Sequence, residues 1–207
     1  MPAGLQIFGD SGVLQIGEDY QNFGMASSGS VTCTTSVGGT GGLYAGTLTL
    51  SSLTFPLLAF RSSYTIAMNF YTLASGQRTY TFYGDLGNTV FWYLFDVMAP
   101  STDTFGLEVF TPSGARAFHS SGKPLRVVQK ISKSAGTGPH SLPSGPIYAV
   151  IPERLGWDET YEDFGGGNYN YVNELHGVSI TSNAFQRYPM LLESYTTTTP
   201  GISRVTG

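Results

Sequence analysis

The segment between residues 153 and 171 holds the side chains best suited to bind or cleave a sugar. Aromatic rings offer flat faces to sugar rings, and Asp, Asn and Glu side chains hydrogen-bond sugar hydroxyl groups. The candidate ligand-binding residues are Trp157, Asp158, Glu159, Tyr161, Asn168, Tyr169, Asn170 and Tyr171. We expect them on a long surface loop, because binding residues commonly lie on loops.

This segment allows three interpretations. In the first, its aromatic rings anchor a loop to the core while the acids face water. In the second, the segment recognises a glycan. In the third, two carboxylates from the set Asp158, Glu159, Glu162 and Asp163 form the catalytic pair of a glycoside hydrolase. We rank the interpretations in this order, and we expect no enzymatic activity and no catalytic residue.

Two short matches to catalytic motifs carry no chemistry. Gly9-Asp10-Ser11-Gly12 matches the nucleophile motif of trypsin-like proteases. It lies at the start of the chain, whereas those enzymes place the serine after the His and Asp that activate it. Ser120-Ser121-Gly122-Lys123 matches S-x-x-K. That motif needs a helical turn, but Gly122 and the following Pro124 indicate a different kind of turn.

The histidines give a weak hint of a metal site. His119, His140 and His176 are isolated in the sequence, and only His176 has an acid nearby at ligand spacing, Glu174. Residues i and i+2 share one face of a strand, so these two could bind a metal together. They are otherwise two exposed side chains of a surface strand. We predict no metal and no cofactor.

Composition limits the class of protein. Charged residues make up 12% of the 207 residues, against about 25% in ordinary soluble domains, and there are 27 glycines. A sparsely charged surface is typical of a chain that works inside an assembly. The net charge of −4 argues against a nucleic-acid partner. No run of 18 apolar residues occurs, so we expect no membrane insertion.

The few charges are unevenly spread. Half of the basic residues fall between positions 116 and 133, and five of the fourteen acids between 153 and 163. Two solvated loop regions would explain this pattern. Alternatively, the basic segment of one subunit meets the acidic segment of another, which would set the register of their contact.

The hydrophobic pattern predicts an all-β, sandwich-like fold. Residues 47–50, 63–71 and 78–83 alternate between apolar and polar positions, and a turn is expected at Gly84-Asp85. Residues 89–97 are a continuous apolar run, which predicts a strand buried on both faces. Residues 132–146 hold three prolines and three glycines, which predicts a long irregular connection. A short helix near Pro152 is the only helical signal.

An internal repeat is the most informative pattern. Residues 4–16 (GLQIFGDSGVLQI) and 106–118 (GLEVFTPSGARAF) share five identical positions of thirteen without a gap. Each copy predicts a β-hairpin, with turns at residues 9–12 and 111–114. A lone hairpin is marginally stable, so each copy must pair with more strands or with the other copy. The separation predicts two related β units, 1–102 and 103–207, the second with long loops and a C-terminal arm from Thr196. A single sandwich with a repeated edge stays open.

The start MPAGLQIF and the stretch from FWYLFD (91–96) through GLEVFTPSGARAFHSSGKPLRVV (106–128) resemble small tail proteins of tailed bacteriophages and prophages. In that group a hairpin of this type precedes a basic and apolar strand, here Leu125 to Val128. The resemblance covers residues 1–25 and about 90–128. His119 after Phe118 and Gly17 after Ile16 stand where the family often has Asp.

The resemblance implies a structural virion protein of the tail tip, baseplate or tail fibre, made in the host cytoplasm. Its partners would be copies of itself, with a trimer as the default, and other tail proteins. The alternative is a tail protein that binds a glycan or protein of the host surface. An envelope-polysaccharide hydrolase ranks third.

Overall fold

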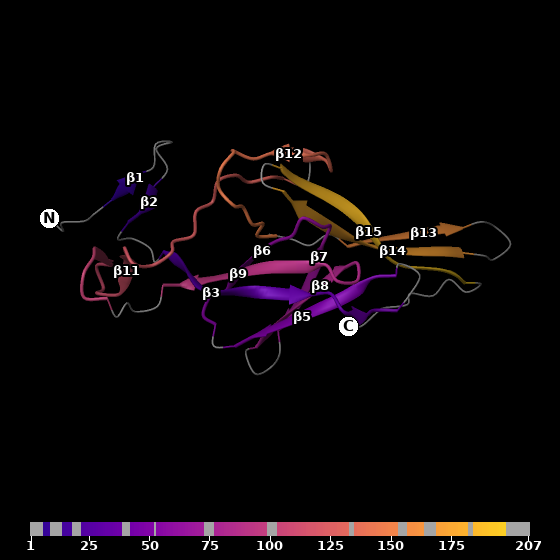
Figure 1. The fold of residues 1–207 in the computed structure, drawn as a ribbon, viewed down its shortest axis with the longest axis horizontal. Helices are drawn as coiled ribbons and strands as arrows, with labels where there is room; N and C mark the ends of the chain where they lie inside the picture. Colours follow the sequence, from indigo (N-terminus) through magenta and orange to yellow (C-terminus); the bar gives the residue numbers. More distant parts are fainter. Residues whose placement is uncertain are drawn as a thin grey trace.

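The computed structural model describes residues 6–8, 14–17, 22–38, 42–51, 53–72, 77–98, 103–132, 135–152, 157–163, 169–181 and 184–197. Within these ranges the chain forms β-strands and no α-helix (Figure 1), so the predicted all-β class is confirmed. The strands are β1 (Ile7–Phe8), β2 (Leu14–Ile16), β3 (Phe23–Thr32), β4 (Thr35–Ser36), β5 (Tyr44–Leu50), β6 (Leu57–Arg61), β7 (Ala67–Thr72), β8 (Arg78–Gly84), β9 (Thr89–Val97), β10 (Glu108–Phe110), β11 (Arg116–His119), β12 (His140–Ser141), β13 (Trp157–Asp163), β14 (Tyr169–Ile180) and β15 (Ala184–Thr197).

Two antiparallel sheets, β3-β9-β6 and β4-β5-β8-β7, share one hydrophobic core. Both sheets contribute alternate residues to it, as in a sandwich. Phe60 of β6 meets Phe82 of β8 edge to face, with ring centroids 5.4 Å apart. The buried members of the cluster are Cys33, Leu58, Phe60, Ile66, Met68, Tyr80, Phe82, Val90 and Leu94. We call this part of the molecule the sandwich.

Alternation explains the strands of the second sheet. In β5 the leucines at 48 and 50 pack against the core, while Thr47 and Thr49 are exposed. Thr49 and its cross-strand neighbour Thr79 in β8 hydrogen-bond through their hydroxyl groups at 3.1 Å. The predicted strands at 47–50 and 78–83 are therefore confirmed. The turn after β8 is confirmed as well, since the Asn88 N–H donates to the Asp85 carbonyl at 3.1 Å.

The prediction for β9 needs a correction. β9 is the central strand of its sheet, and Val90 and Leu94 are buried in the core as expected. Its other face is only partly covered, and Phe91 is 42% exposed. The Arg61 guanidinium lies 4.5 Å from the centre of that ring and its Nε donates to the Tyr93 hydroxyl. One face of β9 is therefore buried and the other is a half-exposed aromatic surface.

A third sheet, in the order β12-β15-β14-β13, lies beside the sandwich (Figure 1). Backbone hydrogen bonds join this sheet, and the chain that leads into it, to the sandwich. Ile66 and Val178 of β14 exchange backbone hydrogen bonds at 2.9 and 2.8 Å. Phe60 of β6 exchanges a similar pair with Val150, which lies on the chain between β12 and β13. These bonds connect residues before position 102 with residues after it. The division into two units at that position stays a prediction.

The predicted long loop around residues 157–171 is wrong for most of its length. Residues 157–163 and 169–171 lie in strands β13 and β14, which pair antiparallel. Acids and asparagines are poor strand formers, but pairing with the long strand β14 outweighs their preference. The predicted irregular connection at 132–146 holds only the two-residue strand β12 in its described part. The expected helix near Pro152 includes residues outside the described ranges.

The C-terminal arm is partly corrected. β15 runs to Thr197, so the first two residues of the expected arm belong to a paired strand. Residues 198–207 lie outside the described part of the chain.

Candidate interaction surface at the hairpin end

The two copies of the repeat form equivalent hairpins. In β1 and β2, Ile7 pairs with Ile16 and Phe8 with Leu14. In β10 and β11, Val109 pairs with Phe118 and Phe110 with Arg116. These pairs are the same positions of the repeat, and both hairpins have an irregular register at the same step, after Ile7 and after Val109. The predicted pair of equivalent hairpins is therefore confirmed in the paired residues, and the two copies also share an irregularity that the sequence did not predict.

The turn of the second hairpin follows the predicted chemistry. The Gly114 N–H donates to the Thr111 carbonyl at 2.9 Å, and Gly114 has a φ of +82°. Glycine is suited to this left-handed conformation because it has no Cβ. The Thr111 hydroxyl also accepts from the Ala115 N–H at 3.0 Å. The turn of the first hairpin lies outside the described residues.

The segments that follow the two hairpins pair with each other. The Leu125 N–H donates to the Phe23 carbonyl, and the Met25 N–H donates to the Lys123 carbonyl, both at 2.8 Å. Phe23 and Leu125 lie outside the repeat itself but are separated by the same 102 positions as its two copies, so the chain segments meet at corresponding distances from their hairpins. This is the geometry of a local pseudo-two-fold axis.

The symmetry is broken at one equivalent pair of positions. The Asn22 backbone N–H and its side-chain Nδ2 both donate to the Ala117 carbonyl, at 2.8 and 3.1 Å. The position equivalent to Asn22 is Pro124, which has no N–H to donate. The segment after the first hairpin can therefore donate this backbone hydrogen bond to the second hairpin, whereas the segment after the second hairpin cannot donate the equivalent bond to the first.

A small apolar cluster holds the hairpins to the sandwich. Met98, at the end of β9, is buried with Val109, Ala117 and Phe118 of the second hairpin, and Ile16 of the first packs against them. An Arg116–Glu108 ion pair at 3.0 Å crosses the second hairpin near its surface. We call both hairpins together with residues 103–107 the hairpin end.

Apolar side chains of the hairpin end also face outward. Phe8 and Phe110 hold the same position in the repeat and are 56% and 48% exposed. Ile7 and Leu107 are exposed as well, and Phe105 is 95% exposed. Large apolar side chains left exposed on a small part of the fold are candidates for contact with another chain.

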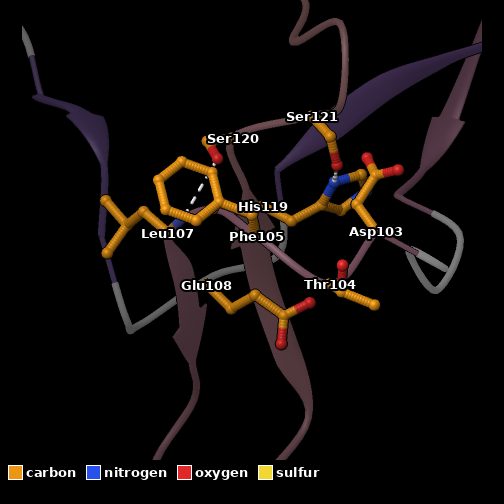
Figure 2. A pocket seen from close by; sticks show the side chains of 9 residues that line it. Asp103, Thr104, Phe105, Leu107, Glu108, His119, Ser120 and Ser121 are labelled. Atoms are coloured by element: carbon orange, nitrogen blue, oxygen red, sulfur yellow. Dashed lines mark hydrogen bonds between the residues drawn. The ribbon is translucent and has the colours of Figure 1, made fainter.

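A shallow pocket of about 160 Å³ opens at the base of the second hairpin (Figure 2). The His119 ring nitrogen Nδ1 and the Ser121 hydroxyl are 2.9 Å apart, and the Asp103 carboxylate lies next to them in Figure 2. The Ser120 hydroxyl accepts from the Leu107 N–H at 2.9 Å and holds the opposite wall. The lining residues are Asp103, Thr104, Phe105, Gly106, Leu107, Glu108, His119, Ser120 and Ser121.

A second hollow of about 400 Å³ shares His119 and Ser121 with the first. Met25, Met98 and Lys123 also line it, so its lining includes two thioether side chains and one ammonium group. The two hollows together offer an exposed ring, hydroxyl groups, carboxylates, an imidazole and an ammonium group. These groups can bind a polar ligand, and their arrangement includes no buried nucleophile.

The structure brings part of the predicted sugar-binding set together. Across β13 and β14, Trp157 pairs with Leu175, Asp158 with Glu174 and Glu159 with Asn173. Nearer the end of the hairpin, Tyr161 pairs with Tyr171, Glu162 with Asn170 and Asp163 with Tyr169. Directly opposed residues have Cβ atoms about 5 Å apart. Asn168 lies outside the described residues, and the sugar-binding role of the set stays a prediction.

Metal binding finds no support in the described residues. Among them, no group of three or more His, Cys, Asp or Glu side chains is placed to hold a metal ion. Glu174 and His176 lie two residues apart on β14, as the metal hypothesis requires. In the same part of the chain, no helix is long and apolar enough to cross a membrane.

Sequence reasoning missed the pocket at His119. Asp103, His119 and Ser121 are distant or unremarkable in the sequence, and the second hairpin brings them together by returning the chain to its starting point. The predicted hairpin does imply this proximity, because residues 103–107 and 119–121 flank its two strands and must therefore lie side by side.

No protein-family model matches this chain, and comparisons with curated proteins and with solved structures find no match either.

Proposed function

We propose that this chain is a structural protein of a bacteriophage tail, in the tip, the baseplate or a fibre, and that it acts by assembling with copies of itself and with other tail proteins. The repeated hairpin motif, which resembles tail proteins, supports the phage assignment. The exposed apolar side chains of the hairpin end support assembly. We expect the working site to be the virion and the expected assembly to be a trimer.

The outward Phe8 and Phe110 carry this proposal. Fully burying a phenylalanine side chain contributes about 1.5–3 kcal/mol relative to leaving it in water, and covering the exposed half of each ring would contribute about half of that. Both rings belong to short hairpins that rest on a cluster of few residues. A partner that covers them would gain burial and would also hold the hairpins in place.

Immunogold labelling and mass spectrometry of purified phage particles test the proposal. The expected result is label at the tail and a fixed copy number of the chain per particle. Absence of the chain from particles that are complete by electron microscopy would contradict it. Release of reducing sugar from host envelope by the purified chain would favour the polysaccharide hydrolase instead.

A second function, recognition of a host glycan, is favoured by the pocket in Figure 2. Phe105 offers a fully accessible ring on the rim of a pocket lined by hydroxyl, carboxylate and imidazole groups. Sugars bind to such combinations of a flat apolar face and polar groups. On this proposal the glycan site lies at the hairpin end and is separate from residues 157–171.

Competition with phage adsorption tests the glycan proposal. Purified chain should block adsorption of the phage to its host, and Phe105→Ala should lose most of that effect. Phe55→Ala is the matched control, because Phe55 is also exposed but lies on the loop before β6. Equal blocking by both variants would contradict a site at Phe105.

A further inference from the structure

We propose that the open edge of β3, at residues 26–30, pairs with the same edge of a second copy around a two-fold axis at Gly29. Ser28 of each copy then bonds to Ser30 of the other, and the sheet β3-β9-β6 continues across the contact. This contact deepens the proposed assembly function and rests on it. It names a surface of the sandwich that joins two subunits, apart from the hairpin end.

β3 is the edge strand of its sheet and is exposed in its middle part. In the strand order β3-β9-β6, β3 has β9 on one side and no described strand of the same sheet on the other. Residues 26–30 are all exposed, so this stretch of the strand is accessible. An edge strand presents N–H and carbonyl groups that can pair with another chain.

The hydrogen bond at the end of β3 shows which backbone groups face the open side. Alternate residues of an antiparallel strand direct both their N–H and their carbonyl to the same side. The Cys33 N–H donates to the carbonyl of Asn88, the residue before β9, at 2.9 Å. Counting back in steps of two, Gly29 also faces β9. Ser28 and Ser30 therefore direct two N–H groups and two carbonyls away from β9, towards the open side.

The open stretch is short and has a boundary at each end. At its start the Met25 N–H donates to the Lys123 carbonyl at 2.8 Å, and the bulge between Met25 and Ser27 lies at the same end. At its end a Cβ on Gly46 of β5 would lie 2.7 Å from the Thr32 carbonyl oxygen, so β5 closes the edge there. Between these boundaries, none of the four outward groups bonds to a described backbone group.

The composition of this edge favours a second copy over a different chain. Residues 20–60 carry no charge, whereas exposed edges are commonly protected by charged side chains or proline. The stretch 26–30 reads Ala-Ser-Ser-Gly-Ser, so no side chain is large enough to select a foreign sequence and none repels a copy of itself. The second copy brings an open stretch of the same length, so both stretches are used in full.

A two-fold axis at Gly29 uses all four outward groups. In an antiparallel pair, a residue whose groups face the partner exchanges both hydrogen bonds with the residue opposite. With Gly29 opposite Gly29 of the second copy, Ser28 lies opposite Ser30 on both sides of the axis. Each copy thus donates two hydrogen bonds and accepts two. The glycines form the closely spaced central pair, where the absence of side chains lets the strands approach.

The contact is isologous, because the same surface serves both copies. It therefore joins units in pairs, either two single chains or two of the trimers that we expect. It does not continue into a filament, since each copy has used its open stretch once the pair has formed. Breaking the contact should therefore halve the mass of the assembly and leave contacts at the hairpin end in place.

Charged variants of the full-length purified chain test the register, with mass measured by analytical ultracentrifugation. Ser28→Lys/Ser30→Lys should halve the mass of the wild-type assembly, because like charges then face each other across the axis. Ser28→Glu/Ser30→Lys should keep the full mass, because opposite charges then face each other. Ser36→Lys, at an exposed serine of β4, is the control and should also keep it.

Circular dichroism and the urea midpoint check that each of these variants is folded, which we expect because every substituted serine is exposed. An unchanged mass in the double-lysine variant would overturn the proposal. An equal loss of mass in both double variants would overturn it as well, because it would show that the two serines do not lie opposite each other.

Amide hydrogen exchange, followed for each residue by NMR, gives independent evidence. The Ser28 and Ser30 amides should exchange slowly in the assembled wild type and about tenfold faster or more in the double-lysine variant. The Gly29 amide faces β9 and should stay slow in both, as the control on the same strand. Fast exchange at both serines in the assembled wild type overturns the contact. So does a wild-type chain that is monomeric at its highest soluble concentration.

The proposed function and this contact fail separately. Labelled phage tails together with a mass that the double-lysine variant does not change would remove only the contact. A chain that pairs and responds to the charged variants as expected, but is absent from particles, would remove only the tail function.

Discussion

The sandwich and the hairpin end use apolar residues in opposite ways. In the sandwich, large side chains such as Phe60 and Phe82 are almost fully buried between two sheets. In the hairpin end, a cluster around Met98 buries few residues, and the repeated phenylalanines face outward. The sandwich thus supplies its own stability. The hairpin end is positioned by the sandwich and keeps apolar surface available for another chain.

The largest expected difference between the two regions comes from removing one ring in each. Phe60→Ala should lower the free energy of unfolding by about 3–5 kcal/mol, because it leaves a cavity in a closed core. Phe8→Ala should change it by less than about 0.5 kcal/mol, because the ring is mostly in water already. Urea denaturation measures both. Equal losses would mean that the hairpin end is as much a part of the core as the sandwich.

Removing a buried carboxylate from the sandwich should give the next largest loss in the free energy of unfolding. Asp96 is 7% exposed and accepts from the Thr54 and Phe55 N–H groups at 2.8 and 2.7 Å. Asp96 also accepts from the Val97 N–H at 2.7 Å, so Asp96→Ala removes the acceptor of three donors and should lower the free energy of unfolding by about 1–3 kcal/mol. The exposed Asp103 at the hairpin end is the matched control, and Asp103→Ala should stay within about 0.5 kcal/mol. A small effect of Asp96→Ala would show that water replaces the carboxylate.

A close approach between strands gives a smaller effect. A Cβ on Gly29 would lie 2.8 Å from Cζ2 of Trp92, its cross-strand neighbour in β9. Gly29→Val should therefore cost about 1–3 kcal/mol by overpacking and shift the tryptophan emission. Ser30→Val, at the next position and exposed, should change neither the free energy of unfolding nor the tryptophan emission. If the two variants behave alike, the sandwich is looser at this end than the structure indicates.

Alkaline pH should give the smallest change in the free energy of unfolding, and this change also comes from groups in the sandwich. Burial raises the pKa of the Cys33 thiol above its ordinary value of 9.0 and that of the Tyr83 hydroxyl above 10.0. Well below pH 9 both groups are neutral in the folded and in the unfolded chain. Above it the unfolded chain ionises first, so the free energy of unfolding falls as pH rises through this range. Urea midpoints from pH 7 to 11 measure the fall, and Cys33→Ala should reduce its slope. A flat profile in the wild type would contradict burial of both groups.

The sequence predicts local features well. The alternation in β5 and β8 and the turn residues of the second hairpin depend on neighbouring residues, and both are confirmed. The repeat also predicted two equivalent hairpins, because identical local patterns favour identical pairing. Their shared bulge was not readable, since a bulge depends on how both strands twist against the cluster at Met98.

Features set by distant partners were missed. Residues 157–163 have the composition of a loop and become a strand because β14 is available to pair with them. The outer face of β9 is as apolar as its inner face, so its partial exposure could not be read from residues 89–97. The pocket at His119 depends on the closure of the second hairpin. The candidate site of the sequence and the pocket of the structure therefore lie in different places.

Sedimentation of the double variant Phe8→Ser/Phe110→Ser, compared with the wild-type chain, is the most direct test of an outward-facing assembly surface. The expected result is loss of the wild-type assembly with an unfolding midpoint close to that of the wild type, because these two rings serve a partner and not the core. Retention of the full assembly, or loss of the fold itself, would contradict it.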